Sequence, residues 1–260
     1  MNNKDLFTDA LLIALSNWQN GWRESQERRR LIADELVKQC EELPAQFKEV
    51  KARCYRKRFI NEGEVVPIIL DNDFFEGLAS WTENKDYARG FKGIIRPRSK
   101  FVMLFNHKPL SGEVVVNFVR LWKDKQFQEA AEDLKSRNPD AVSALFHFKD
   151  SQSEVVLRST LRGSEIEDIV GLSSSFEIIC DMGGIPEEER EELSIKYAKN
   201  SKGLPIEFPT FAGSKATKKV IRKTIKKMKD TLQFHKENNV LVDWSRVAKP
   251  HKDDLKHRKL

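Results

Sequence analysis

The spacing of the apolar residues changes near residue 50 of the chain. Before this point apolar residues such as Leu11, Ala14 and Trp18 recur at helical intervals, so residues 5–50 are expected to form helices. From Lys51 onward, short runs of β-branched and aromatic residues are separated by turn-forming residues, a pattern typical of strands. We expect strands over residues 53–60, 65–70, 93–95, 101–105, 113–119, 154–157 and 175–180.

Helices are expected between and after these strands. The patterns over residues 81–91, 124–136 and 186–200 are helical, and the stretch Ser214–Glu237 predicts a basic helix with one apolar stripe. Helices at both ends and strands between them predict an α+β fold. The predicted parts are an N-terminal helical segment (1–50), a mainly antiparallel sheet core (51–184) and C-terminal helices with the basic helix and a tail (185–260).

The positive charge of the chain is concentrated in its last part. The 260 residues carry a net charge of +6, but residues 215–260 hold 15 Lys and Arg against 5 Asp and Glu, a net charge of +10, which leaves −4 for the rest. This concentration predicts a polyanionic partner for the tail. A solvated helix face explains the same charges equally well.

Composition also excludes several classes of protein. No apolar stretch approaches the roughly 20 residues that span a bilayer, and the N-terminus lacks the pattern of a secretion signal, so no membrane partner is expected. Cys40, Cys54 and Cys180 are widely spaced, which predicts neither a disulfide framework nor a zinc site. We therefore expect a protein of the reducing cytoplasm.

Three short motifs carry the candidate chemistry of the chain. Breaking a glycosidic bond passes through an oxocarbenium-like sugar, which needs a nearby carboxylate. Glu154 begins an apolar strand and can supply that carboxylate at the mouth of a cleft, while the guanidinium of Arg56 suits phosphate and ribose oxygens. Gln152 would face the same side as Glu154 on an extended chain and meet the acceptor. The motifs are Tyr55-Arg56, Ser80-Trp81-Thr82 and Gln152-Ser153-Glu154.

In this order, the motifs resemble those of mono-ADP-ribosyltransferases of the Arg–Ser–Glu type, a family that includes bacterial toxins, phage enzymes that modify host proteins, and toxin components of anti-phage systems. The resemblance covers residues 50–182 and implies a split β-sheet ADP-ribosyltransferase-like core that uses NAD as a substrate and no metal. It departs from the family in that Trp81 takes the place of a middle hydroxyl and that residues 120–137 look like an inserted helix.

The resemblance also implies a role for each motif residue. Glu154 would stabilise the oxocarbenium ion and bind the ribose, and Gln152 would position the acceptor. The implied NAD-binding residues are Tyr55 and Arg56 on the phosphate side, with Ser80, Trp81, Thr82 and Phe91 around the nicotinamide. A neighbouring arginine, Arg53 or Arg58, can take the place of Arg56 in the alignment.

Two features point to the acceptor. Enzymes of the family with Gln at the first position of the third motif modify asparagine in Rho proteins or guanine bases. The second case fits the basic tail, so we expect nucleic acid, RNA above DNA, as the acceptor ahead of a host protein. Salt-sensitive phosphate contacts from the basic helix fit this acceptor. The candidate acceptor-binding residues are Phe146 and Phe148, which can stack on a base, and the cations Lys219, Arg222, Lys223 and Lys226.

Each motif also has a simpler structural explanation. Glu154 can be an exposed strand residue, Arg56 part of a solvated strand edge, and Ser80 the N-cap of a helix with Glu83 three residues later. Phe146 and Phe148 fit a half-buried strand. The basic helix can pack on the domain or bind an acidic partner such as an antitoxin. The alternative function is a non-catalytic nucleic-acid-binding or interaction module, and a metal-dependent nuclease lacks a supporting motif.

The expected function is thus a mono-ADP-ribosyltransferase that moves ADP-ribose from NAD to a macromolecular acceptor. A role as a toxin or as an effector in phage defence, with an antitoxin or other inhibitory protein as partner, follows from the resemblance alone.

Overall fold

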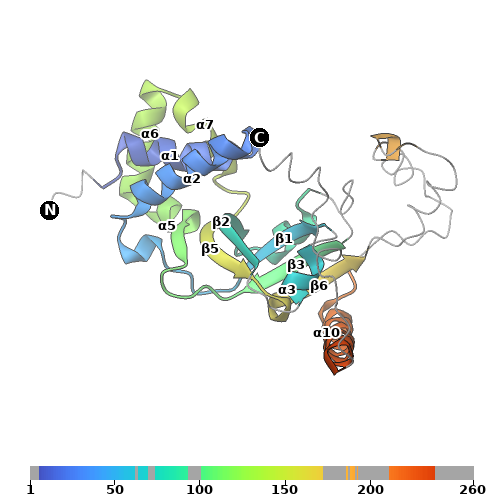
Figure 1. Cartoon of the computed structure of the whole chain (residues 1–260). Helices are drawn as coiled ribbons and strands as arrows, with labels where there is room; N and C mark the ends of the chain where they lie inside the picture. Colours follow the sequence, from blue (N-terminus) through green and yellow to red (C-terminus); the bar gives the residue numbers. More distant parts are fainter. Residues whose placement is uncertain are drawn as a thin grey trace.

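The structure is a computed structural model (Figure 1) that describes residues 6–61, 64–69, 74–92, 101–171, 186, 188–190, 192 and 211–237. The strands predicted over residues 93–95 and 175–180, and most of the helix predicted over 186–200, lie outside the described residues. Within these ranges the chain has one six-stranded antiparallel sheet with helices at both ends, so the predicted α+β fold is confirmed. No helix in the described part of the chain is both long and apolar enough to cross a membrane.

The N-terminal segment forms two helices, as predicted. Helix α1 (Asp9–Asn20) begins after Thr8, whose hydroxyl oxygen accepts a hydrogen bond from the backbone N–H of Leu11. Ser25 caps helix α2 (Gln26–Cys40) in the same way. The apolar positions Leu11, Leu12 and Leu15 are at most 2% exposed, which fixes α1 against the rest of the fold.

The sheet places its strands in the order β4-β5-β2-β1-β3-β6, and each neighbouring pair is antiparallel. Strands β1 and β2 share only one registered pair, whereas β2 and β5 pair along most of their length. The pairing of β1 with β2 is therefore the shortest in the sheet. The strands are β1 (Cys54–Ile60), β2 (Phe74–Thr82), β3 (Phe101–His107), β4 (Val114–Asn117), β5 (Glu154–Leu161) and β6 (Ile166–Gly171).

The two faces of the sheet carry separate apolar clusters. Because side chains alternate along a strand, Val156 of β5 faces the N-terminal helices, whereas Val155 and Leu157 face the opposite side with Trp81 and Ile221. Figure 1 shows the N-terminal helices, and the helices that pack with them, on one side of strands β2 and β5, whereas α10 lies beside β6. These helices are α5 (Phe118–Lys123), α6 (Lys125–Arg137), α7 (Ser143–Phe148) and α10 (Ser214–Glu237).

Several predicted elements differ from the observed ones. The run over residues 65–70 is not a strand but contains the short helix α3 (Val65–Ile69), because a brief apolar run has no periodicity that separates the two states. The predicted strand over 113–119 divides into β4 and the start of α5. The predicted helix over 81–91 is only α4 (Lys85–Gly90), since the preceding residues complete β2. Strands β2 and β6 were not predicted at all.

Candidate active site

Strands β2 and β5 bring the second and third motifs together. They pair with Thr82 opposite Glu154 and Ser80 opposite Val156, so Ser80, Thr82 and Glu154 lie on the same face of the sheet. Strand β1 lies on the other side of β2, with Tyr55 opposite Thr82. The three motifs therefore meet on three neighbouring strands, although about a hundred residues of chain separate the first from the last.

Glu154 lies at the centre of this site and is only 4% exposed. Its Oε1 accepts hydrogen bonds from the hydroxyl of Ser80 at 2.5 Å and from the indole N–H of Trp18 at 3.0 Å. Its Oε2 accepts one from the side-chain amide of Gln19 at 2.9 Å. Burial raises the pKa of the Glu154 carboxyl, although these hydrogen bonds and the charge of Arg56 act in the opposite direction. The interpretation of Glu154 as an exposed strand residue is wrong.

Arg56 reaches the same point from β1. Its Nη1 donates to the backbone carbonyl of Ser80 at 2.7 Å, and its Nε and Nη2 bind the carboxylate of Glu76 at 2.8 and 3.2 Å. Ser80 is thus bonded to both charged groups, through its hydroxyl to Glu154 and through its carbonyl to Arg56. Arg56, Ser80 and Glu154 converge in space, as an active site built from the three motifs requires.

The two neighbouring arginines are placed differently. Arg58 forms ion pairs with Glu76 and, at 3.3 Å, with Glu64, and Arg53 is exposed and donates to Asn106 at 3.2 Å. Only Arg56 of the three has a described hydrogen bond to the second motif. Strand β1 lies between β2 and β3, so Arg56 does not belong to a solvated sheet edge.

The second and third motifs are also joined through the backbone. The hydroxyl of Thr82 donates to the carbonyl of Gln152 at 2.5 Å, and the N–H of Glu83 donates to the carbonyl of Ser153 at 3.2 Å. Ser153 has a φ of 45°, in the left-handed region that serine seldom adopts. The segment before Glu154 is therefore not extended, and the expectation that alternation alone aligns Gln152 with Glu154 is wrong. Backbone strain of this kind is common beside functional residues.

The second motif contributes hydroxyls but no indole to the site. Trp81 is 2% exposed and packs in the apolar cluster on the opposite face from Ser80, because adjacent strand residues point in opposite directions. The prediction that Trp81 lines the nicotinamide pocket is therefore wrong. Ser80 lies within β2 and the N-cap of α4 is Asn84, so the capping interpretation of Ser80 is also wrong.

The aromatic residues near the site lie at its margin. The ring of Tyr55 is half-buried, and the Lys85 ammonium lies 5.7 Å from its centre. Phe91 directly follows α4, is 39% exposed and lies 5.8 Å from the ring of Tyr87. Burial and, secondarily, the charge of Glu154 raise the pKa of Tyr87. Helix α4 therefore places Tyr87 within the electrostatic reach of the catalytic candidate.

The two candidate stacking residues lie in helix α7, not in a loop or a strand. The ring of Phe146 lies 5.4 Å from that of Trp122, and the Lys135 ammonium lies 4.0 Å from its centre. Phe146 packs at the margin of the apolar cluster that contains the buried leucines of α1. Phe148 is half-buried against His147. Phe146 is thus half-buried and packed against the domain, which favours the simpler structural explanation of this residue over base stacking.

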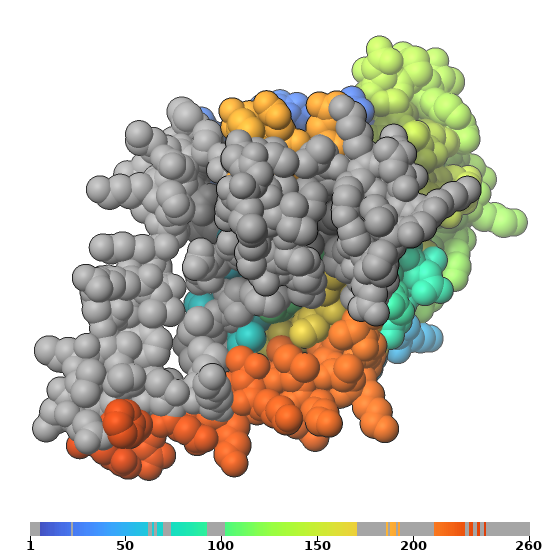
Figure 2. All heavy atoms as spheres, turned by 90° about the vertical axis from the view of Figure 1, so that its right-hand side faces the viewer, coloured from blue at the N-terminus to red at the C-terminus, as the bar shows by residue number. Residues whose placement is uncertain are grey.

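Helix α10 presents the cations that the structure describes to solvent, while two residues of its apolar stripe pack against the sheet. Ile221 is 7% exposed and Ile225 packs beside it in the cluster around Trp81. Figure 2 shows α10 in orange along the lower edge of one face of the molecule. The exposed cations are Lys215, Lys218, Lys219, Arg222, Lys223, Lys226 and Lys229.

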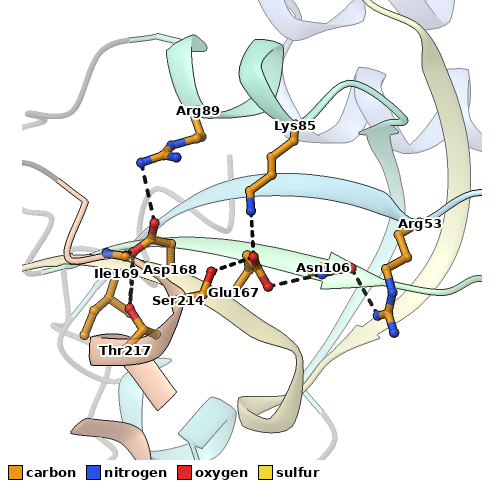
Figure 3. Close-up of polar contacts among 10 residues, drawn as sticks. Arg53, Lys85, Arg89, Asn106, Glu167, Asp168, Ile169, Ser214 and Thr217 are labelled. Carbon is orange, nitrogen blue, oxygen red and sulfur yellow. Dashed lines mark hydrogen bonds and ion pairs between the residues drawn. The ribbon is translucent and has the colours of Figure 1, made fainter. Parts of the chain in front are cut away.

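A polar cluster anchors the start of α10 (Figure 3). Asp168 accepts hydrogen bonds from the N–H of Gly213 at 2.7 Å and from the hydroxyl of Thr217 at 3.2 Å. Glu167 accepts from Ser214 and from Lys85 of α4, both at 2.6 Å. These lysine, serine and further asparagine contacts lower the pKa of Glu167 to about 2 in spite of its partial burial. The cluster ties the basic helix to α4, which follows the second motif.

A second buried centre lies beside Trp81. The ring of His107 is 5.6 Å from that indole, and its Nδ1 and Nε2 lie 2.7 Å from Glu165 and 2.8 Å from Glu113. Burial alone would lower the pKa of His107, but the two carboxylates outweigh it and raise the pKa. A protonated His107 can donate to both of them.

Three residues that contact Glu154 or Arg56 lie outside the three sequence motifs. Trp18 and Gln19 come from α1, and Glu76 comes from a strand that was not predicted. Trp18 was assigned only to the apolar stripe of a helix, and a strand with Gly77 in its middle has a weak local signal. No feature of the sequence near these residues connects them with Glu154 or Arg56.

Comparison with known proteins adds no relative. No family model matches the chain, and neither a curated protein nor a solved structure matches it. Among the residues that the structure describes, no group of three or more His, Cys, Asp or Glu side chains could hold a metal ion. The geometry of the three motifs is therefore the basis for assigning a function to this protein.

Proposed function

We propose that this protein is a mono-ADP-ribosyltransferase that uses NAD as its substrate. The observation that carries the proposal is the position of Ser80, which contacts Glu154 through its hydroxyl and Arg56 through its carbonyl. This contact joins a guanidinium suited to a pyrophosphate with a carboxylate suited to a cationic sugar. The Arg–Ser–Glu resemblance of the motifs agrees with the same assignment.

In the proposed reaction, the bond between nicotinamide and ribose C1′ breaks, and its electron pair leaves with neutral nicotinamide. The ribose then carries positive charge at C1′, which the ionised Glu154 stabilises by proximity. A nucleophilic atom of the acceptor forms a bond to C1′ and loses its proton to solvent. Gln152, joined to the second motif through its carbonyl, would position that acceptor.

The NAD phosphates would bind at Arg56. Its guanidinium is 24% exposed as a side chain, so part of it remains accessible to a ligand while Glu76 fixes its plane. Tyr55 would add to the phosphate side, and Ser80, Thr82 and Phe91 to the nicotinamide side. The pairing of Tyr55 with Thr82 across β1 and β2 supports this arrangement for the residues on the strands.

The acceptor that we favour is nucleic acid, RNA above DNA, ahead of a host protein. The exposed cations of α10, among them Lys219, Arg222, Lys223 and Lys226, would contact phosphates without reading sequence. Phe148 keeps some exposure for stacking. A function as a toxin or in phage defence, in the cytoplasm and under the control of an antitoxin or similar inhibitor, is the corresponding biological proposal.

The second candidate is a nucleic-acid-binding or interaction module without catalysis. The same basic face of α10 favours it, since that face needs no reaction to bind a polyanion. Binding to RNA that weakens steeply with salt, without any consumption of NAD, would support this candidate.

Incubation with NAD labelled in its adenylate half, and with separate pools of RNA, DNA and cell protein, tests the two proposals together. We expect label on RNA with the wild-type protein and none with Glu154→Gln. A Lys219→Glu, Lys223→Glu variant should transfer less label to RNA at moderate salt, while its hydrolysis of NAD with water as the acceptor, measured without RNA, should equal that of the wild type. Intact NAD in every pool would contradict the transferase and favour the binding module.

A further inference from the structure

The last turn of α1 contributes directly to the environment of Glu154. Leu11, Leu12 and Leu15 are buried in the same cluster as Val156, which lies two residues after Glu154 on β5. The helix therefore shares an apolar cluster with the strand that carries the carboxylate, and the side chains of Trp18 and Gln19 contact that strand directly. Side chains from its last turn meet the carboxylate in a fixed geometry.

The donors divide unequally between the two carboxylate oxygens. Oε1 receives the Ser80 hydroxyl and the Trp18 N–H, and that N–H also lies 3.1 Å from the Ser80 oxygen. Oε2 receives only the amide of Gln19 among the described residues. Because each oxygen has two acceptor positions, Oε1 is filled and Oε2 keeps one position for another donor.

Gln19 itself has an unused acceptor. It is 8% exposed, and its Oε1 is buried without a hydrogen-bond partner among the described residues. A buried acceptor without a partner costs free energy, so such groups call for an explanation. The spare positions on Glu154 and Gln19 belong to two side chains in direct contact, and the hydroxyls of a ribose are donors that fit them.

We propose that Trp18 and Gln19 are positioning residues for ADP-ribosyl transfer, which hold Glu154 so that the free position of its Oε2 receives a ribose hydroxyl of NAD. This inference rests on the proposed function. It extends the site beyond the three motifs and into the N-terminal helix, where the sequence resemblance implied no residue.

The two contacts also stabilise the ionised form of Glu154. The charged and titratable groups that act on Glu154 are Arg56 from β1 and Tyr87 from α4, while Ser80, Trp18 and Gln19 are neutral donors. Burial raises the pKa of Glu154 and each hydrogen bond to the carboxylate lowers it. Removing one of these donors should therefore raise the pKa further. The activity of such a variant should then require a higher pH than that of the wild type.

Two conservative variants test the proposal. Gln19→Leu removes the amide at similar volume, and Trp18→Phe removes the indole N–H but keeps an aromatic ring. We expect each to lower kcat about tenfold with little change in KM for NAD, because a hydrogen bond to a charged group is worth about that factor. Asn17→Leu is the matched control, since Asn17 is exposed on the same turn, and it should retain wild-type kinetics.

Titration of the Glu154 carboxyl by carbon NMR provides a readout that needs no NAD. We expect its pKa to be higher in Gln19→Leu and Trp18→Phe than in the wild type or in Asn17→Leu. Wild-type kcat and an unchanged titration in both variants would overturn the inference even in an active enzyme. A wild type that does not cleave NAD would contradict both the proposed function and the positioning role in transfer. A shifted titration in the variants would still establish the two contacts with Glu154.

Discussion

Two buried carboxylates on neighbouring strands have opposite surroundings. The Glu76 side chain on β2 is 7% exposed and lies between the guanidiniums of Arg56 and Arg58, whereas Glu154 on β5 is 4% exposed and accepts hydrogen bonds mainly from neutral groups. Burial would raise the pKa of both. Two arginine charges nevertheless lower the pKa of Glu76, and the neutral donors leave that of Glu154 raised.

Under the proposed function, the difference corresponds to a structural role for Glu76 and a catalytic role for Glu154. Glu76 has its countercharges within the protein, so it stabilises the fold and orients Arg56. Burial makes Glu154 costly to ionise in the free protein, and in the proposed reaction it would gain a close countercharge when positive charge develops on the bound sugar. Pairs of carboxylates with opposite pKa shifts are typical of active sites.

Removing the charge of Glu76 should have the largest effect on stability. Glu76→Gln leaves Arg56 and Arg58 without their shared carboxylate, and we expect the free energy of unfolding to fall by about 2–3 kcal/mol, below the value for fully buried pairs because the guanidiniums are a quarter exposed. Urea denaturation measures this change. Because the pKa of Glu76 is lowered in the folded state, the difference should persist at neutral pH and diminish as the pH falls through that pKa.

The control for this variant is Asp9→Asn. Asp9 forms an ion pair with Arg137 at 2.9 Å, but both side chains are half exposed, so the loss should be far smaller than that of Glu76→Gln. Equal losses for the two variants would contradict a structural role for Glu76.

His107 provides a third case for comparison, because its ring lies between the carboxylates of Glu113 and Glu165. The pKa of His107 is raised in the folded state. The contribution of the protonated ring to stability is therefore complete below the ordinary histidine pKa, and it is lost as the pH rises through the pKa of the folded state. We expect wild-type stability to decline by about 1–2 kcal/mol over this window, measured by urea denaturation at a series of pH values. His107→Gln should remove the decline. A wild type whose stability does not change over this range would exclude a charged His107.

Glu154→Gln should have the smallest effect on stability and the opposite sign to Glu76→Gln. The pKa of Glu154 is raised in the folded state, so ionisation costs more free energy in the folded protein than in the unfolded chain. Stability therefore falls as the pH rises from the pKa of the unfolded chain to that of the folded protein. A neutral amide removes this cost and can donate to the unpaired Oε1 of Gln19. We expect the free energy of unfolding at neutral pH to stay within about 1 kcal/mol of the wild type or to increase. A marked loss in thermal denaturation would make Glu154 a structural residue.

Local pattern was sufficient to predict part of the fold. Helix α10 was predicted with its observed bounds, because its charges and its apolar stripe repeat over many turns. Strands β1, β3 and β5 were likewise predicted, each with a start within one residue of the observed one. The helix α3 was mistaken for a strand because five apolar residues carry too little periodicity to decide.

The candidate site was predictable only as far as its motifs. Arg56, Ser80 and Glu154 could be named from their order, but their meeting depends on the pairing of β2 with β1 and β5. Trp18 and Gln19 reach Glu154 from about 135 residues away in the chain, which no local pattern encodes. Trp81 was misplaced because β2 was not predicted as a strand, and strand alternation is what turns its ring into the core.

The most direct test of the account is the release of nicotinamide from NAD in the presence of RNA, measured for the wild type and for Glu154→Gln over roughly pH 4 to 8. The account predicts release by the wild type, with an acid limb above the ordinary pKa of a glutamate, because the Glu154 pKa is raised and the ionised form is required. It predicts a loss of at least about a hundredfold in the variant at every pH. Wild-type rates from Glu154→Gln would contradict the central claim.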